Sequence, residues 1–257
     1  MLYGFFCWNR KYLMANLVSR NLKLRYRKSS LGFLWTLLVP AAMALTYFFV
    51  FNFVIKVKVE GYLLYLIAGL IPWTFFSSAV MTSTESVVNN YALLSKVPIP
   101  FNAFPLSDVV AAYFNFLLSV PVLVAIACFY HKFPSWSWIS LALPFACIFI
   151  QGYSFGLVFS VIYVHLRDMR HLVGIGMQLW LYFTPILYQS KDIPERFSRY
   201  FLINPLFYIF DSIHGTFMRG EWPNQLAVTH MIASTCFLMI AALIVYVKVG
   251  DNLVERI

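Results

Sequence analysis

Aromatic side chains are the first residues in this sequence that could do chemistry. The chain of 257 residues contains 26 Phe, 16 Tyr and 7 Trp, and many of them crowd two apolar stretches. The candidates are Tyr47, Phe48, Phe51, Trp180, Tyr182, Phe183 and Tyr188. Each ring presents a large apolar face, on which the apolar face of a sugar can stack, so a passage lined in this way could slide a glycan. An aromatic belt at the membrane surface and ordinary core packing are the alternatives.

A basic cluster comes directly before the first long apolar run. It comprises Arg25, Arg27 and Lys28, and upstream of it leucines recur among further basic residues at positions 13, 17, 22 and 24. A basic amphipathic helix tends to lie along a membrane surface, so residues 1–30 are predicted to form a cytoplasmic interface helix. Nucleic-acid binding is the competing interpretation of a basic stretch, and the adjacent apolar run disfavours it.

Residues that would support catalysis or nucleotide binding are missing from the sequence. No GxxxxGK[ST] loop occurs, so any ATP that drives this protein must bind another polypeptide. The four cysteines lack the spacing of metal ligands, and the five histidines are scattered. Glu85 and Asp108 fall near the ends of apolar runs, which argues against an ion-coupled carrier, since such carriers place ionisable groups at mid-membrane. We therefore predict no catalytic residue, metal site or cofactor in this chain, and no enzyme activity.

The composition places the protein in a membrane. Hydrophobic residues make up 61% of the chain, charged residues make up 11%, and the mean hydropathy is +0.75. Soluble domains carry about a quarter charged residues, because their surface faces water. No linker or low-complexity tract divides the sequence, so residues 1–257 are predicted to form a single all-α membrane domain.

Six apolar runs have the length needed to cross a bilayer core of about 30 Å as helices. They cover residues 31–55, 62–84, 109–130, 138–164, 172–188 and 226–247. The resulting bundle extends from residue 31 to residue 247 and leaves residues 248–257 as a short tail. An even number of spans puts both termini on one side of the membrane.

The distribution of Lys and Arg indicates which side that is. Seven of these residues precede the first span, and 12 of the 19 in the whole chain fall on the same side as the termini. Cytoplasmic segments carry the excess of Lys and Arg, so both termini are predicted to be cytoplasmic.

The least regular stretch follows the fifth predicted span, between residues 184 and 224. It contains four prolines, which break helices, yet it keeps an apolar run over residues 201–210. Irregular backbone exposed to lipid is not tolerated, so we expect re-entrant or interfacial helices that pack against protein on the outer side. A plain outer loop is the alternative.

Several segments, in order along the chain, resemble the ABC-2 type membrane subunits of polysaccharide exporters. Residues 25–35 read RYRKSSLGFLW and resemble the family's basic helix with its LGxLW motif, and residues 69–77 read GLIPWTFFS. The remaining matches are LSKVPIP at 94–100, Arg167-Asp168, TPILY at 184–188 and NPL at 204–206. The Arg167-Asp168 and TPILY signatures look closer to O-antigen permeases than to capsule permeases, and teichoic acid permeases share them.

The resemblance implies a function and partners. Two copies of this chain would pair with two ATP-binding subunits, which carry ATP and Mg, in the bacterial inner membrane. The complex would export undecaprenyl-diphosphate-linked polysaccharide, most closely an O-antigen, from cytoplasm to periplasm. Teichoic acid, capsule, lipid or drug export by the same architecture stays open as an alternative, and an ion-coupled carrier is less favoured.

The resemblance also assigns roles to residues. The basic cluster would attract the lipid diphosphate, and the aromatic candidates would line a glycan channel built from the first and fifth spans. Contact with the ATP-binding subunits would fall on Leu94, Lys96, Val97, Pro98, Arg167 and Asp168.

Overall fold

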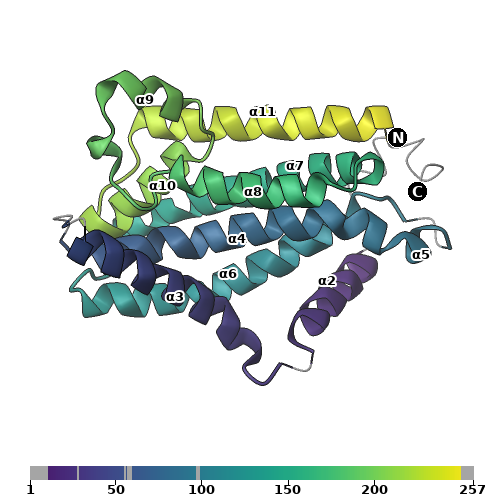
Figure 1. Ribbon diagram of the computed structural model, residues 1–257, viewed down its shortest axis with the longest axis horizontal. Helices are drawn as coiled ribbons and strands as arrows, with labels where there is room; N and C mark the ends of the chain where they lie inside the picture. Colours follow the sequence, from purple (N-terminus) through teal and green to yellow (C-terminus); the bar gives the residue numbers. More distant parts are fainter. Residues whose placement is uncertain (1–10, 28, 55, 57–59, 97–98, 250–257) are drawn as a thin grey trace.

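A computed structural model describes residues 11–27, 29–54, 56, 60–96 and 99–249. These residues form helices joined by turns, with no strand among them, which confirms the all-α prediction (Figure 1). Lys28, Val97 and Pro98 from the predicted sites lie outside the described residues, as do residues 1–10 and the tail from residue 250 onwards.

Five helices in the described part of the chain are long and apolar enough to cross a membrane. They are α3 (Trp35–Phe49, continued by a π-helical turn over Val50–Val54), α4 (Tyr62–Asn89), α6 (Ala103–Phe129), α7 (Ala142–His165, preceded by a 3-10 segment over Trp136–Leu141) and α11 (Gln225–Val249). Five of the six predicted spans are thus confirmed as apolar helices, with boundaries shifted by a few residues.

Helix α4 lies at the centre of the bundle. It is largely buried, and it packs against α3, α6, α7, α8 (Met169–Tyr182) and α10 (Phe207–His214). Its contact with α7 is close, since a Cβ added to Gly156 would lie 2.5 Å from the Cβ of Ser83. Small residues at such a crossing let two membrane helices approach each other tightly.

The predicted fifth span is shorter as a helix than expected. Helix α8 ends at Tyr182, and at 14 residues it is about 21 Å long, less than the bilayer core. Pro185 explains the end of the helix, because proline has no N–H to donate and disfavours helical geometry in the residue before it.

The non-helical segment after α8 is held by two tyrosines of α4. The Tyr62 hydroxyl donates to the Leu187 carbonyl at 2.6 Å, and the Tyr65 hydroxyl lies 2.6 Å from the Tyr188 carbonyl and 3.2 Å from that of Pro185. Residues 184–187 are buried. Irregular backbone at membrane depth needs such partners inside the protein, and α4 supplies them.

The N-terminal helix α2 (Lys11–Tyr26) forms within the predicted interface segment. It folds back along α6, while α3 leans away from the bundle towards its own N-terminal end (Figure 1). Leu17 is the buried residue of α2, and the helix also turns polar side chains towards the bundle. The short helix α5 (Tyr91–Leu94) lies at the same end of the molecule (Figure 1).

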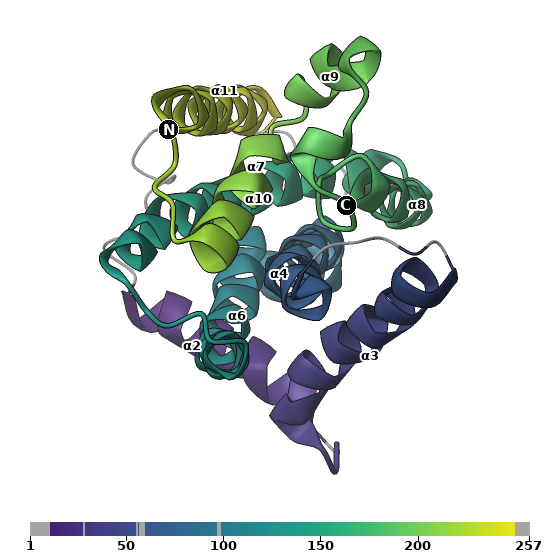
Figure 2. The same ribbon diagram turned by 90° about the vertical axis from the view of Figure 1, so that its left-hand side faces the viewer.

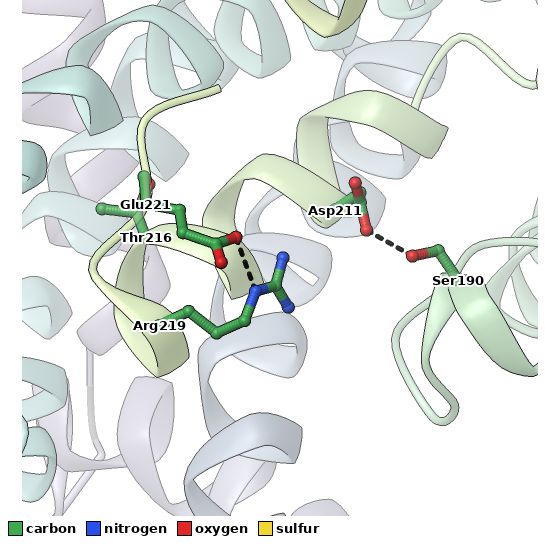
Figure 3. Close-up of polar contacts among 5 residues, drawn as sticks. All are labelled: Ser190, Asp211, Thr216, Arg219 and Glu221. Carbon is green, nitrogen blue, oxygen red and sulfur yellow. Dashed lines mark hydrogen bonds and ion pairs between the residues drawn. The ribbon is translucent and has the colours of Figure 1, made fainter. Parts of the chain in front are cut away.

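Two short helices occupy the opposite end. Helix α9 (Glu195–Leu202) is exposed, whereas α10 is largely buried against α4, α7 and α11. Polar contacts fasten this end: Ser190 donates to Asp211 of α10 at 2.5 Å, and Arg219 pairs with Glu221 at 2.6 Å (Figure 3). The irregular stretch therefore contains two short helices, of which α10 packs on the bundle, rather than a plain loop.

Candidate functional site

A cavity of about 1060 Å³ lies between α3, α4, α6 and α8, and the C-terminal end of α2 closes one side of it. Helices α3 and α8 stand on either side of α4, which forms the back wall (Figure 2). The cavity extends from Arg25 and Ser29 near α2 to Tyr47 and Tyr182 near the opposite end of the bundle.

The lining of this cavity is mostly apolar but includes a set of hydroxyl and amide side chains. Apart from the tyrosines, these are Ser29, Thr36, Thr74, Ser77, Ser78, Thr82, Asn115 and Gln178. On α4 they recur every three or four residues and so share one face. The Thr74 hydroxyl donates to the Ile71 carbonyl at 2.9 Å, and the Thr82 hydroxyl donates to the backbone carbonyl of Ser78 at 2.8 Å. Each hydroxyl oxygen keeps its lone pairs free to accept a hydrogen bond from a bound molecule.

Sequence reasoning missed this polar row, although a signal for it was present. Hydroxyl residues at helical spacing inside an apolar span, from Thr74 to Thr82, indicate a face that does not contact lipid. The contribution of Gln178 was harder to foresee, because it depends on how α8 lies beside α4.

The end of the cavity next to α2 carries its positive charge. Among the described residues that line it, Arg25 is the one with a formal charge, and its guanidinium donates to the Ser78 hydroxyl. The Tyr26 hydroxyl donates to Asn115 Oδ1 at 2.7 Å. Burial raises the pKa of Tyr26, against a smaller opposite effect of Arg25, so this hydroxyl remains a donor. Arg27 is exposed and does not line the cavity.

Two of the seven predicted aromatic residues line the cavity at its other end. Tyr47 of α3 and Tyr182 of α8 share a side-chain hydrogen bond, which joins the two helices there. Tyr188 donates to the Tyr182 carbonyl at 2.7 Å and supports that position. Phe48 and Phe51 instead pack on Tyr62, with ring centroids 6.5 and 6.2 Å from it.

The other two aromatic candidates, Trp180 and Phe183, line a separate apolar groove of about 840 Å³ between α8 and α9. The Trp180 ring packs edge-on against Phe76 and Phe155, with centroids 5.6 and 5.1 Å away. Its indole N–H donates to Asn204 Oδ1 at 2.9 Å. These contacts give Trp180 a packing role in addition to any contact with a guest.

Four of the predicted contact residues for a partner are among the described residues, and they lie at the α2 end of the bundle. Leu94 is buried, Lys96 and Asp168 are exposed, and the Arg167 guanidinium lies 5.4 Å from the centre of the Tyr163 ring. Nearby, Arg170 at the start of α8 pairs with Glu85 of α4 at 3.1 Å. This ion pair was not foreseen.

Comparison with known proteins gives one family. The profile of the family described as ABC-2 type transporter matches residues 12–218. The O-antigen export system permease protein RfbA of Klebsiella pneumoniae is 35% identical over 234 residues, which cover 89% of this chain and 90% of that protein. RfbA of Myxococcus xanthus is 29% identical over 95% of both chains. The polysialic acid transport protein KpsM of Escherichia coli is 22% identical over 92% of this chain and 93% of its own length.

Proposed function

The chain belongs to the ABC-2 type transporter family, and from this premise we propose that it is the membrane subunit of an exporter for lipid-linked polysaccharide of the O-antigen type. The observation that carries the proposal is the cavity lined by hydroxyl, amide and aromatic side chains, in a chain whose relatives over almost the full length are O-antigen export permeases. A capsule-type polysaccharide is the second candidate, supported by the more distant similarity to KpsM.

The cavity has the chemistry to receive the first part of such a cargo. Undecaprenyl diphosphate, the proposed lipid carrier, brings negative charge, which Arg25 attracts at the α2 end. Arg27 and Lys28 add to this attraction at the membrane surface. Sugar hydroxyls then exchange hydrogen bonds with the row on α4 and with Gln178, and Tyr47 and Tyr182 offer ring faces further along.

The proposed orientation places α2 and α5 in the cytoplasm and α9 and α10 on the periplasmic side of the inner membrane. It follows from the excess of Lys and Arg around α2. Helix α8 together with residues 183–188 makes the sixth crossing, so both termini are cytoplasmic. Helices α9 and α10 act as the interfacial and re-entrant elements that close the exit.

Two copies of the chain assemble with two separate ATP-binding subunits, which hold ATP and Mg. Leu94, Lys96, Arg167 and Asp168, together with Val97 and Pro98, contact those subunits and transmit their closure to the bundle. This chain itself catalyses no reaction.

The test is complementation of a strain that lacks this chain. Deletion should abolish surface O-antigen and leave lipid-linked polysaccharide in the cytoplasmic leaflet, and the wild-type gene should restore export. Gln178→Leu should restore it poorly, because it removes an amide from the cavity. Thr229→Leu is the matched control, since Thr229 is an exposed polar residue on α11 that bonds within its own helix. A deletion strain with unchanged surface polysaccharide would contradict the proposal.

A further inference from the structure

Helix α2 is attached to the bundle through polar side chains as well as through Leu17. The Asn21 amide donates to Asp108 Oδ1 at 2.7 Å and to the Ser107 hydroxyl at 3.0 Å, both on α6. The Arg20 guanidinium donates to Asn90 Oδ1 at 2.5 Å, next to α5. The partners in these contacts are 70 to 87 residues apart in the sequence. Helix α2 thus contacts α6 and the residue before α5, on either side of the loop predicted to contact a partner.

Asp108 is the centre of this attachment. Its side chain is partly buried near the start of α6, which disfavours a charged carboxylate, and the nearby charges of Arg20 and Arg25 offset only part of that cost. A carboxylate on a membrane helix is costly unless it has partners, and α2 supplies them. Neither the cavity nor the ion pair between Glu85 and Arg170 includes Asp108.

We propose that Asp108 is a positioning residue that fastens α2 to α6, so that a displacement of α2 at the cytoplasmic surface is passed to α6. The step from displacement to transport rests on the proposed function, since the ATP-binding subunits would be what moves α2.

Hydrogen bonds suit this role because they fix the register of two helices. A shift of α2 by one turn, about 5.4 Å, would separate the Asn21 amide from the carboxylate. The carboxylate would then be left partly buried without its donor, which is unfavourable. Helix α2 is therefore either bound to Asp108 or released from it. Intermediate positions are unfavourable, because they break the hydrogen bond between Asn21 and Asp108.

The first experiment measures how firmly α2 is seated, without any transport assay. The complex is prepared in inverted membrane vesicles from a chain whose native cysteines are replaced and that carries Leu17→Cys. Leu17 is 4% exposed, so its replacement thiol should react slowly with a membrane-impermeant maleimide while α2 is seated. A separate chain with Leu24→Cys is the control, since Leu24 is exposed whether or not α2 is seated.

Asp108→Leu should raise the labelling rate of the Leu17→Cys thiol about tenfold, the scale expected when a buried hydrogen-bond partner is removed. Asn21→Ala should do the same, and the double variant should add little, because both changes break one interaction. Asp108→Asn keeps an acceptor oxygen and should stay near the parent rate. An unchanged rate in Asp108→Leu would overturn the attachment, and so would a parallel rise in the Leu24→Cys control, which would mean that α2 unfolds.

The second experiment compares polysaccharide exported with ATP hydrolysed in the same complexes. Asp108→Leu should lower the amount exported per ATP severalfold while the complex still assembles and hydrolyses ATP, and Asp108→Asn should largely retain it. If a variant with a raised labelling rate exported as much polysaccharide per ATP as the parent, that result would refute the proposal that α2 passes its displacement to α6. If the wild-type complex exports no polysaccharide, the proposed function fails, whereas the labelling result still decides whether Asp108 seats α2.

Discussion

At the scale of single residues, Gly152 and Gly156 share one face of α7 but have different surroundings. A Cβ at position 156 would lie 2.5 Å from the Ser83 Cβ, whereas at position 152 its nearest neighbour would be a Phe76 ring carbon at 3.7 Å. Gly156→Ala should therefore destabilise the protein by about 1–3 kcal/mol through overpacking, and Gly152→Ala should be tolerated. Thermal unfolding in detergent measures the difference.

Ser83→Gly provides the internal check on this prediction. It removes the atoms that a new methyl group at position 156 would strike, so it should recover part of the stability lost in Gly156→Ala. Recovery should be incomplete, because the Ser83 hydroxyl also donates to the Pro105 carbonyl at 3.2 Å. Equal melting temperatures for the two glycine variants would contradict the packing at this crossing.

Asn204 uses both ends of its side-chain amide. Its oxygen accepts from the Trp180 indole and from the Leu206 N–H, and its nitrogen donates to the Phe183 carbonyl at 2.9 Å and the Thr184 hydroxyl at 3.0 Å. Asn204→Leu leaves several buried polar groups without a partner, at about 1–3 kcal/mol for each, and should lower the melting temperature strongly. Trp180→Phe loses one of these bonds and should lower it less. An Asn204→Leu chain as stable as the wild type would exclude this network as a support of the segment that follows α8.

At the scale of elements, length and hydropathy predicted five spans well because each is a long uninterrupted apolar helix. They failed for the end of α8, since Ile186 and Leu187 are apolar without being helical. Their burial depends on Tyr62 and Tyr65, which lie more than 100 residues earlier in the chain and hold the backbone there. A local pattern cannot report such a partnership.

Only part of the candidate site could be predicted, because a local sequence pattern does not show which rings face the cavity. Tyr47 and Tyr182 line the cavity, whereas their neighbours Phe48 and Phe183 pack elsewhere, and a role of any of these rings in glycan passage stays a prediction. Adjacent residues on a helix point in different directions, so only the packing of α3 and α8 around α4 separates cavity rings from core rings.

The ion pair between Glu85 and Arg170 joins the C-terminal end of α4 to the start of α8, and its contribution to stability should be small. The two side chains are 24% and 60% exposed, so water and salt screen their attraction. Glu85→Gln should cost less than about 1 kcal/mol, and the reversed pair Glu85→Arg with Arg170→Glu should recover most of it. Thermal unfolding at low and high salt measures this difference in stability. A loss of stability in Glu85→Gln that persists at high salt would contradict the prediction.

At the scale of the whole molecule, the polar groups on α3, α4 and α8 must be shielded from lipid. Gln178 is exposed on the face that carries the cavity, and a polar side chain of this kind is unfavourable in lipid. The outward face of α11 is different, since its exposed residues between Ile232 and Val247 are apolar, among them Phe237 and Ile240. Lipid can cover α11, whereas the α3 and α8 face calls for another protein surface, which a second copy of the chain supplies in the proposed dimer.

This argument predicts where two copies meet. In a chain with its native cysteines replaced, Leu38→Cys on α3 and Leu179→Cys on α8 should each give a cross-linked dimer with a short bifunctional maleimide in native membranes. Both positions are exposed in the single chain. A chain that keeps only Cys236 is the matched control, because this native cysteine is exposed on α11. Dimers should form at the first two positions and not at Cys236. The opposite pattern would place lipid beside the cavity and α11 between the copies, and the cavity would then need a different explanation for its polar lining.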